Sequence, residues 1–431
     1  MHIQTLTLTN FRGAQSLSLD LHERLNVLVG VNGAGKSTVL DACATMLSWA
    51  VSRIRQAGTS GRQISEEDIT NKQGVAAIEI SCVDDAQKMT WRLAKSRKGY
   101  GSPEHPSDLK ELSTYTKQIQ ARIANTDQRT NIPLFAHYPV TRAVLEIPLR
   151  IRGRHSFELL AAYDDALTTG ANFRTFFEWF REREDLENEI LVRRSQPTLF
   201  DDEKANEYPD PHLQAVRNAL GRLLPEFEQL TVRRSPLRME IQKNGEILTV
   251  NQLSDGEKCL IAMVSDLARR LAIANPALEN PLDGDGIILI DEIDLHLHPN
   301  WQRMIANRLL DIFPNCQFIV STHSPHVLTH VHPENILILH WSEGSVEALR
   351  PEESYGRKVD RILEDLMGLD TTRPEKIDKK IRGLFNMISQ SNANELSGIR
   401  EELKRIKQEI GNDPELIKAE GLIRRKELIG K

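Results

Sequence analysis

The chain is poor in cysteine and contains no long apolar run. Its four cysteines, Cys43, Cys82, Cys259 and Cys316, lie far apart and form neither a CxxC pair nor a disulfide framework, which fits a reducing cytoplasm. No run of about 18 apolar residues occurs, so no membrane span is predicted. The first residues lack a basic segment followed by an apolar core, so no signal peptide is predicted. We therefore expect a cytoplasmic protein with no membrane partner.

An excess of positive charge is also absent. The formal net charge of -6 excludes a polycation, so a contact with nucleic acid would need a local basic patch. Four basic clusters of this chain are candidates for such a patch, although most runs of charged residues are only solvated faces. They are Lys95-Arg97-Lys98, Arg150-Arg152-Arg154, Arg193-Arg194 and Arg233-Arg234-Arg238. With 431 residues the chain is too long for one core, so two or three structural units are expected.

Alternating and helical patterns predict a layered α/β fold. Apolar residues alternate through the first thirty residues and again over 75–95, which predicts antiparallel strands. Asn244-Gly245 lies between two strand-like runs within 237–250 and is typical of a two-residue hairpin turn. A helix over 256–274, a strand over 286–290, a helix over 299–312 and a strand over 317–321 then predict a parallel sheet covered by helices.

The strongest motif is a glycine-rich loop between an apolar run and an amphipathic helix. Gly30-Val31-Asn32-Gly33-Ala34-Gly35-Lys36-Ser37 matches G-x-x-x-x-G-K-[ST] at every fixed position. Such a loop points backbone N–H groups at phosphate oxygens, and the following helix adds its positive dipole end. Lys36 is expected to contact the β- and γ-phosphates of ATP, and Ser37 to ligate Mg²⁺. The predicted nucleotide-binding residues of this loop are Gly30, Asn32, Gly33, Gly35, Lys36, Ser37 and Thr38.

Two acidic residues follow the apolar strand 286–290. In an open α/β sheet, ligands bind at the carboxyl ends of the strands, which is where Asp291 and Glu292 are expected. Asp291 is predicted to hold Mg²⁺, and Glu292 to orient and deprotonate the attacking water. Alone, the pattern would equally fit a strand that ends in a solvated acidic loop, and the phosphate loop favours the catalytic interpretation.

A helix N-terminus carries the third motif, Leu253-Ser254-Asp255-Gly256-Glu257-Lys258. Ser254 fits a helix N-cap, which would leave the first N–H groups of the helix available to an anion. By itself the segment fits a plain cap better than a ligand site. It resembles, however, the ABC signature in the LS-x-GE-K form of chromosome-maintenance and DNA-repair ATPases. The resemblance implies that Ser254 and Gly256 meet the γ-phosphate bound by a second copy, so that ATP joins two heads in a homodimer or a higher homo-oligomer.

Further segments resemble elements of the same families. Ser321-Thr322-His323-Ser324-Pro325 resembles the switch-histidine loop, which implies that His323 reaches the γ-phosphate, and Asp294 matches the D-loop position. Asn10-Phe11-Arg12-Gly13 resembles an N-terminal element of SMC, Rad50, RecF and OLD-type ATPases, in which a basic residue approaches the nucleotide. For Arg12 an exposed turn residue is an equally good interpretation. The glutamine of the Q-loop is not assigned, and the histidines over 296–332 lack partners at metal-ligand spacing.

The long segment between the phosphate loop and the Ser254 motif distinguishes the branches of this superfamily. The distance from Ser37 to Ser254 is 217 residues, but sustained heptads are missing, so we expect a compact helical lobe in place of a long coiled coil. The aromatic group over 173–180 is expected to form the core of this lobe in preference to a base-stacking platform. The residues after 345 are expected to be helical and contain no D-x-D, so we do not expect a nuclease.

The segment 291–299, with Trp301-Gln302, closely resembles the OLD-like and Septu ATPases. Because OLD nucleases continue into a nuclease domain that is not expected here after 345, the chain resembles the PtuA family of the Septu anti-phage defence system, including retron-associated versions. This resemblance covers the motifs throughout 1–345, and the tail is only broadly similar. The resemblance implies an α/β fold: an ABC-type (SMC/Rad50/OLD-like) P-loop ATPase head with a helical insert and a helical tail. The expected segments are 1–100 (head), 101–230 (insert), 231–345 (head) and 346–431 (tail for partner docking or oligomerisation).

The resemblance also implies a function. The chain would bind and hydrolyse ATP with Mg²⁺, with turnover that can be slow, and would control a partner HNH nuclease, PtuB. Retron versions add a reverse transcriptase and its single-stranded DNA. The alternatives are a DNA-repair ATPase of the RecF, RecN or SMC type, or an OLD-like ATPase that acts directly on DNA. A transport ATPase is disfavoured by the Asn10-Phe11-Arg12-Gly13 start, the GE-K signature and the large insert.

Overall fold

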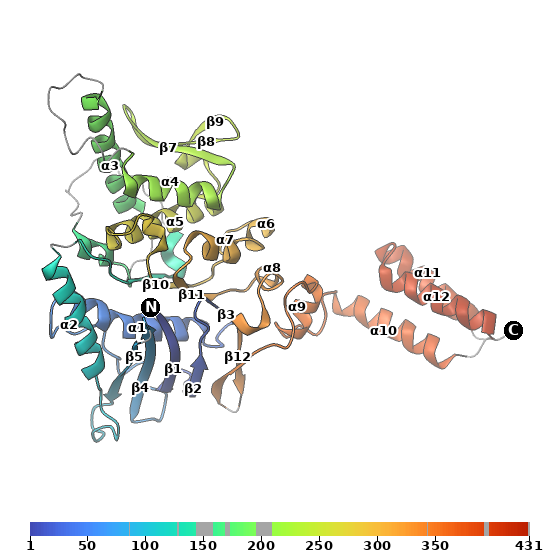
Figure 1. The fold of residues 1–431 in the computed structure, drawn as a ribbon. Coiled ribbons are helices and arrows are strands. Elements are labelled where there is room, and N and C mark those ends of the chain that lie inside the picture. Colours follow the sequence, from blue (N-terminus) through green and yellow to red (C-terminus); the bar gives the residue numbers. More distant parts are fainter. Residues whose placement is uncertain are drawn as a thin grey trace. The chain divides into compact units, whose positions relative to one another are not determined.

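The computed structural model describes most of the chain as two compact units (Figure 1). The described residues are 1–85, 87–126, 129–143, 158–168, 173–194, 209–342, 344–391 and 396–429. The first unit is Met1–Val359 and the second is Asp360–Lys431. Each unit is described by itself below.

A six-stranded sheet forms the centre of the first unit, with strand order β13-β12-β3-β11-β10-β6. Its strands are β3 (Leu25–Val29), β6 (Leu134–Tyr138), β10 (Gly286–Ile290), β11 (Cys316–Ser321), β12 (Ile336–Ser342) and β13 (Ser345–Leu349). All run parallel except β13, which pairs antiparallel with β12. Every residue of β3, β6, β10 and β11 is buried, as expected of parallel strands covered on both faces. The segments that follow β3, β10 and β11 therefore leave the sheet at one common edge.

A four-stranded antiparallel sheet lies on the other side of α1 (Lys36–Arg55), which contacts strands of both sheets (Figure 1). Its order is β2-β1-β4-β5. The strands are β1 (His2–Phe11), β2 (Ala14–Asp20), β4 (Val75–Asp84) and β5 (Gln87–Ser96). The predicted antiparallel strands are confirmed. The buried Gln317 of β11 exchanges hydrogen bonds of 2.7 and 2.8 Å with the backbone of Ile3, which ties this sheet to the central one.

The long α5 (Asp255–Ala274) packs against α4 (Pro211–Leu223) and contacts α3 (Phe173–Arg194). A three-stranded sheet follows α4 and consists of β7 (Phe227–Arg234), β8 (Leu237–Lys243) and β9 (Glu246–Thr249). The hairpin predicted at Asn244-Gly245 is confirmed, because Lys243 pairs with Glu246 and both turn residues have positive φ. The aromatic residues of α3, from Phe173 to Phe180, are buried, which confirms that they form a core.

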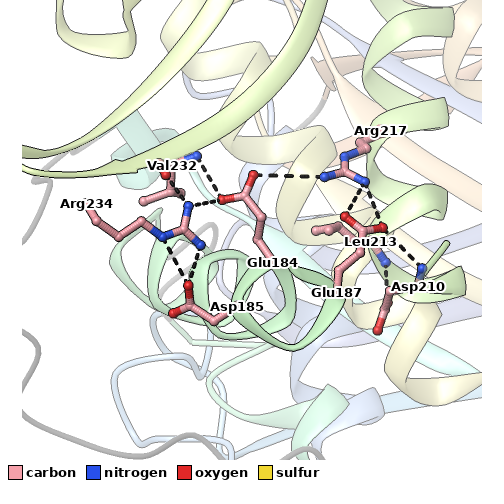
Figure 2. A network of polar contacts seen from close by, with 8 residues as sticks. All are labelled: Glu184, Asp185, Glu187, Asp210, Leu213, Arg217, Val232 and Arg234. Carbon is pink, nitrogen blue, oxygen red and sulfur yellow. Dashed lines mark hydrogen bonds and ion pairs between the residues drawn. The ribbon is translucent and has the colours of Figure 1, made fainter. Parts of the chain in front are cut away.

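A network of ion pairs joins α3, α4 and β7 (Figure 2). The buried Glu184 of α3 accepts from the backbone N–H of Val232 at 3.1 Å and from the guanidinium of Arg234. One turn further along, Glu187 accepts from Arg217 of α4 at 2.9 and 3.1 Å. Because these carboxylates are buried and paired, they fix β7 and α4 to α3 in one arrangement. Arg234 of this network is also a member of the basic cluster Arg233-Arg234-Arg238, so its charge is paired within the protein.

The basic clusters have different surroundings in the structure. Arg234 is paired with Glu184 and Asp185, while both Arg233 and Arg238 contact Glu240. Such internal pairing lowers the positive potential that this cluster can offer to phosphates. The cluster Arg150-Arg152-Arg154 lies outside the described residues.

Two helical predictions need correction. The helix expected over 299–312 is two short helices, α6 (Pro299–Gln302) and α7 (Ile305–Ile312), because Gln302 turns back to donate to the carbonyl of Leu297 at 2.9 Å. The helical tail expected from 346 starts later, because Ser345–Leu349 is the edge strand β13. Within the predicted helical lobe, Leu159–Tyr163 forms a 3-10 turn. The segment boundaries predicted at 100 and 230 stay predictions.

One of the remaining described α-helices precedes α3, and the others follow β11. They are α2 (Lys110–Asn125), α8 (Pro325–Leu328), α9 (Val359–Asp365), α10 (Glu375–Gln390), α11 (Leu396–Ile410) and α12 (Pro414–Ile429). Leucine and isoleucine residues of α10, α11 and α12 form one buried cluster that includes Leu384 and Ile406. Within the described ranges, no helix is long and apolar enough to cross a membrane.

Candidate nucleotide-binding site

The predicted phosphate loop follows β3 and ends in the first turn of α1. A Cβ atom on Gly30 would lie 2.3 Å from the carbonyl oxygen of Leu339 on β12, so this position accepts only glycine. The loop closes on itself because Lys36 Nζ donates to the carbonyls of Gly30 at 2.8 Å and Val31 at 3.2 Å. Val31, Asn32 and Gly33 form the exposed part of the loop.

Lys36 is a buried ammonium near three carboxylates. Burial lowers its pKa below the ordinary value, and the charges of Asp291, Glu292 and Asp294 oppose that shift. The predicted acids therefore lie near the phosphate loop, although they are more than 250 residues away in sequence. Ser37 and Thr38 follow in the first turn of α1, with their backbone N–H groups at the helix N-terminus, where an anion is favoured.

Asp291 lies at the end of β10 between two hydroxyl groups. Its Oδ2 accepts from Ser37 Oγ at 2.9 Å, and its Oδ1 accepts from Ser321 Oγ. Mg²⁺ takes octahedral oxygen ligands at about 2.0–2.1 Å, and adjacent ligands of such an ion lie about 2.9 Å apart. The Ser37–Asp291 pair thus has the spacing of two neighbouring magnesium ligands.

Phosphate oxygens and water would have to complete such a site. In the described parts of the chain, no three His, Cys, Asp or Glu side chains are grouped to hold a metal by themselves. That is the usual condition of a nucleotide-associated Mg²⁺, which binds one or two protein groups and the phosphates of its substrate. The residues present therefore fit this ion.

The loops after β10 and β11 hold each other through backbone and hydroxyl contacts. The N–H of Glu292 donates to Ser321 Oγ at 2.8 Å, and the N–H of Ile293 donates to the carbonyl of Ser321 at 2.9 Å. Thr322 Oγ1 donates to Asp294 Oδ1 at 2.5 Å. Glu292 has a φ of +50°, a backbone conformation that is uncommon outside glycine and often found at functional sites.

His323 follows Thr322 in the same loop and is partly exposed. The structure thus brings Glu292, Asp294 and the segment before His323 to one edge of the sheet, beside the phosphate loop. Ser321 and Thr322 position the acidic residues, a role that the sequence did not reveal. The sequence shows only that two hydroxyl residues stand at the end of a buried strand.

Ser254 caps α5 through a reciprocal pair of bonds with Glu257. The backbone N–H and Oγ of Ser254 both donate to Glu257 Oε2 at 2.8 Å, and Ser254 Oγ accepts from the N–H of Glu257 at 3.4 Å. Burial raises the pKa of Glu257, but hydrogen bonds from Lys243 and Ser254 outweigh it, so this pKa lies below its ordinary value. Ser254 and Asp255 are exposed.

The start of α5 also lies against the predicted D-loop segment of the same chain, which follows Asp294. A Cβ atom on Gly256 would lie 2.3 Å from the carbonyl oxygen of His296, which excludes a side chain there. Ser254 therefore lies at an exposed helix end that is capped by Glu257, and the buried Gly256 packs against His296, whereas Ser37 of the phosphate loop contacts Asp291 at the end of β10.

Arg12 is held by two carboxylates at the β1–β2 turn. Its Nη1 donates to Asp41 of α1 at 2.7 Å and its Nε donates to Asp68 at 2.9 Å. Burial lowers the pKa of Arg12, but the two carboxylates outweigh it and raise this pKa. Asp41 lies about one turn beyond Ser37, so the guanidinium is fixed near the start of α1 and is more than an exposed turn residue.

A buried ion cluster links α5 to the end of β10. The carbonyl of Tyr138 accepts from the N–H of Asp291 at 2.9 Å, and its hydroxyl donates to Asp266 Oδ2 at 3.1 Å. Asp266 is completely buried and accepts from Arg269 and Arg270, each at 2.7 Å. Burial raises the pKa of Asp266, but Arg270 and Arg269 outweigh it and lower this pKa. The i, i+3 and i+4 spacing of Asp266, Arg269 and Arg270 on an apolar helix is the sequence pattern that could have predicted this cluster.

A phosphate loop after β3, acids after β10, a hydroxyl-rich loop after β11 and a capped α5 define the head of a P-loop ATPase. Residues 25–329 match the family described as "AAA domain, putative AbiEii toxin, Type IV TA system". The retron Ec83 probable ATPase of Escherichia coli is 32% identical over 441 residues, which cover 90% of this chain and 80% of that protein. The Septu protein PtuA of Bacillus thuringiensis is 26% identical over 379 residues, 86% of this chain and 85% of that protein.

The chain belongs to this family of AAA-domain ATPases, together with the Septu PtuA and retron ATPases. The predicted fold class and the predicted ATPase are thereby confirmed. A solved structure, the Smc head domain of Pyrococcus furiosus bound to the C-terminal domain of ScpA, is 13% identical with a TM-score of 0.46. The match covers 81% of this chain and 96% of that one.

Proposed function

We propose that this chain is the ATP-controlled subunit of an anti-phage defence complex and that it regulates a partner HNH nuclease. The observation that carries the nucleotide site is the 2.9 Å contact between Ser37 Oγ and Asp291 Oδ2 beside Lys36. It joins the phosphate loop to the acidic end of β10 at the spacing that Mg²⁺ requires. The defence role is supported by the similarity to PtuA of Bacillus thuringiensis and to the retron Ec83 protein.

In the proposed site, Gly30 to Thr38 bind the triphosphate of ATP through backbone N–H groups, and Lys36 contacts the β- and γ-phosphates. Ser37 and Asp291 hold Mg²⁺, which neutralises charge on the phosphate oxygens when it is bound. Ser321 Oγ donates to Asp291 and accepts from the N–H of Glu292, so one hydroxyl fixes the orientation of both acids.

Glu292 is the proposed general base and removes a proton from the attacking water. Asp294, held by Thr322, and the neighbouring His323 face the γ-phosphate side of the site in this proposal. Arg12 is a nucleotide-facing residue whose position depends on Asp41 and Asp68.

Two copies of the chain are proposed to share each ATP. The exposed N-terminus of α5 offers backbone N–H groups, which suit the γ-phosphate bound by a second copy, and Ser254 Oγ would reach this phosphate by giving up its bond to Glu257 Oε2. The exposed Asp255 would oppose an anion there, but Lys258 Nζ lies 3.1 Å from its carboxylate and offsets that charge. Gly256 allows α5 to begin against His296, so the D-loop and the signature helix move as one piece.

The second unit is proposed to dock a partner or to support oligomerisation. The partners implied by the resemblance are the HNH nuclease and, in a retron version, a reverse transcriptase with its single-stranded DNA. The chain itself is not proposed to cut nucleic acid.

The nucleotide site is tested by ATP binding to the full chain and to Lys36→Ala. The variant should lose ATP binding, because the loop loses its only buried ammonium, while Lys88→Ala, an exposed lysine of β5, should bind ATP normally. Equal ATP affinity of Lys36→Ala and the wild type would contradict the proposal.

The partner is tested by co-purification from cells that express the chain together with a candidate HNH nuclease. A stable complex supports the proposed regulation. If the chain bound no nuclease and loaded alone onto DNA in an ATP-dependent manner, a DNA-repair ATPase would be the better description.

A further inference from the structure

One tryptophan of the first unit is exposed close to the phosphate loop. Trp49, Trp91 and Trp179 are buried, whereas Trp341 near the end of β12 has 55% of its surface exposed. Trp341 thus differs from the buried tryptophans, and it presents a large apolar surface to solvent. An exposed indole can stack on a planar ligand, and its place beside the phosphate loop makes it a candidate for contact with a nucleotide.

The indole of Trp341 packs against Gly13. A Cβ atom on Gly13, in the β1–β2 turn, would lie 2.8 Å from Cζ3 of Trp341 and 3.7 Å from Cγ2 of Val346. Gly13 therefore allows the ring to lie directly on the turn that carries Arg12. The Cζ3–Cη2 edge of the ring is covered, and the exposed surface lies on the rest of the ring.

Trp341 also lies one strand away from the phosphate loop. It is the direct cross-strand partner of Val346 on β13, so the two side chains project from the same face of the hairpin. The methyl groups of Val346 lie 3.3 and 3.4 Å from a Cβ atom placed on Gly35, the residue before Lys36. Val346 therefore lies between Gly35 of the phosphate loop and Trp341.

The strand order gives the direction in which a nucleotide would extend. The acids Asp291, Glu292 and Asp294 follow β10, which lies on the β11 side of β3, while β12 and β13 lie on the opposite side. A terminal phosphate with Mg²⁺ belongs beside Ser37 and Asp291, since these groups carry the metal site. The rest of the nucleotide must leave on the side away from these carboxylates, toward the hairpin of Trp341.

We propose that Trp341 stacks on the purine base of the bound nucleotide and thereby favours a nucleoside triphosphate over a bare polyphosphate. This inference rests on the proposed nucleotide site. The exposed part of the flat indole would contact the base, and Gly13 supports the Cζ3–Cη2 edge of the ring. Stacking on an aromatic side chain tolerates either purine, so Trp341 supplies affinity for the base and little discrimination between adenine and guanine.

The test compares ATP with inorganic tripolyphosphate on the full chain. Trp341→Ala should weaken ATP binding by about 5- to 150-fold, the range for loss of one stacked base. Tripolyphosphate has no base, so its affinity should not change. Trp341→Phe should keep most of the ATP affinity, because it keeps an aromatic face. Leu349→Ala, an exposed apolar residue of the same hairpin, should leave both affinities unchanged.

Fluorescence gives a second readout that a merely structural role would not change. ATP should quench the emission of the wild type, tripolyphosphate should not, and Trp341→Phe should lose the ATP-dependent quenching. Unchanged ATP affinity in Trp341→Ala would overturn the inference, including the case in which only nuclease binding is lost. Equal weakening of ATP and tripolyphosphate would overturn it too, because Trp341 would then act through the phosphate loop. If the wild type bound neither ligand, the proposed nucleotide site itself would fail.

Discussion

The buried carboxylate of Asp266 offers the clearest quantitative test of how the head is held together. The Asp266→Asn variant keeps the shape of the side chain but removes its charge. Arg269 and Arg270 would then lose the carboxylate that each contacts at 2.7 Å, and Tyr138 would lose a charged acceptor at 3.1 Å. All of these groups are buried, so water cannot readily replace the lost partner.

Removing one member of a buried ion cluster costs about 3–5 kcal/mol, since an uncompensated charge remains in the interior. Tyr138→Phe removes only one hydrogen bond to a charged group and should cost about 1.5–3 kcal/mol. Urea unfolding at neutral pH, followed by circular dichroism, measures both losses as shifts of the midpoint of the first unit.

The same variants should slow ATP hydrolysis more than they weaken ATP binding. The backbone of Tyr138 accepts from the N–H of Asp291, so a shift of Tyr138 moves the acidic end of β10. Glu375→Gln breaks an exposed ion pair with Lys379 and should change neither the midpoint nor the turnover. A midpoint of Asp266→Asn equal to that of the wild type would refute the assigned role of the cluster.

Three further outcomes follow from the contacts of α5 and of the second unit. Gly256→Ala should cost about 1–3 kcal/mol, because its Cβ atom would collide with the carbonyl of His296, and thermal unfolding with Gly221→Ala, a glycine with open space, as control measures it. Glu257 has a lowered pKa in the folded chain, so its contribution to stability is present above its unfolded pKa and is lost as pH falls through the folded one. In Glu257→Gln this acid dependence should disappear from urea midpoints measured against pH. Leu384→Ala, at the centre of the α10–α12 cluster, should cost about 2–5 kcal/mol in the unfolding of the second unit, with ATP binding unchanged.

Local sequence patterns predicted the parts of the head that depend on neighbouring residues. The glycine spacing of 30–37 and the apolar run that ends at Asp291 identify elements whose geometry is set within a few residues. The Asn244-Gly245 hairpin is of the same kind, because positive φ at both turn positions is a local requirement.

Contacts between distant segments were beyond this kind of prediction. Gln317 exchanges hydrogen bonds with Ile3, 314 residues away, and Tyr138 pairs with Asp266, 128 residues away. Neither contact has a period or a spacing along the chain. The edge strand β13 was missed because a five-residue strand after Gly344 has too few residues to show a clear alternation.

The break between α6 and α7 was missed for a similar reason. The apolar spacing over 299–312 is that of one helix, but Gln302 bonds to the carbonyl of Leu297 and to Ser324 in the loop after β11. Contacts to another loop therefore decide where the helix ends, and sequence propensity does not include them.

The mass in solution of Glu292→Gln, measured by light scattering with ATP and Mg²⁺, tests the shared-ATP arrangement most directly. The account predicts that ATP at least doubles the mass of this slowly hydrolysing variant. It also predicts that adding Ser254→Arg, which would fill the exposed end of α5, prevents the increase. A mass that is the same with and without ATP, or that still increases when Ser254 is replaced, would contradict it.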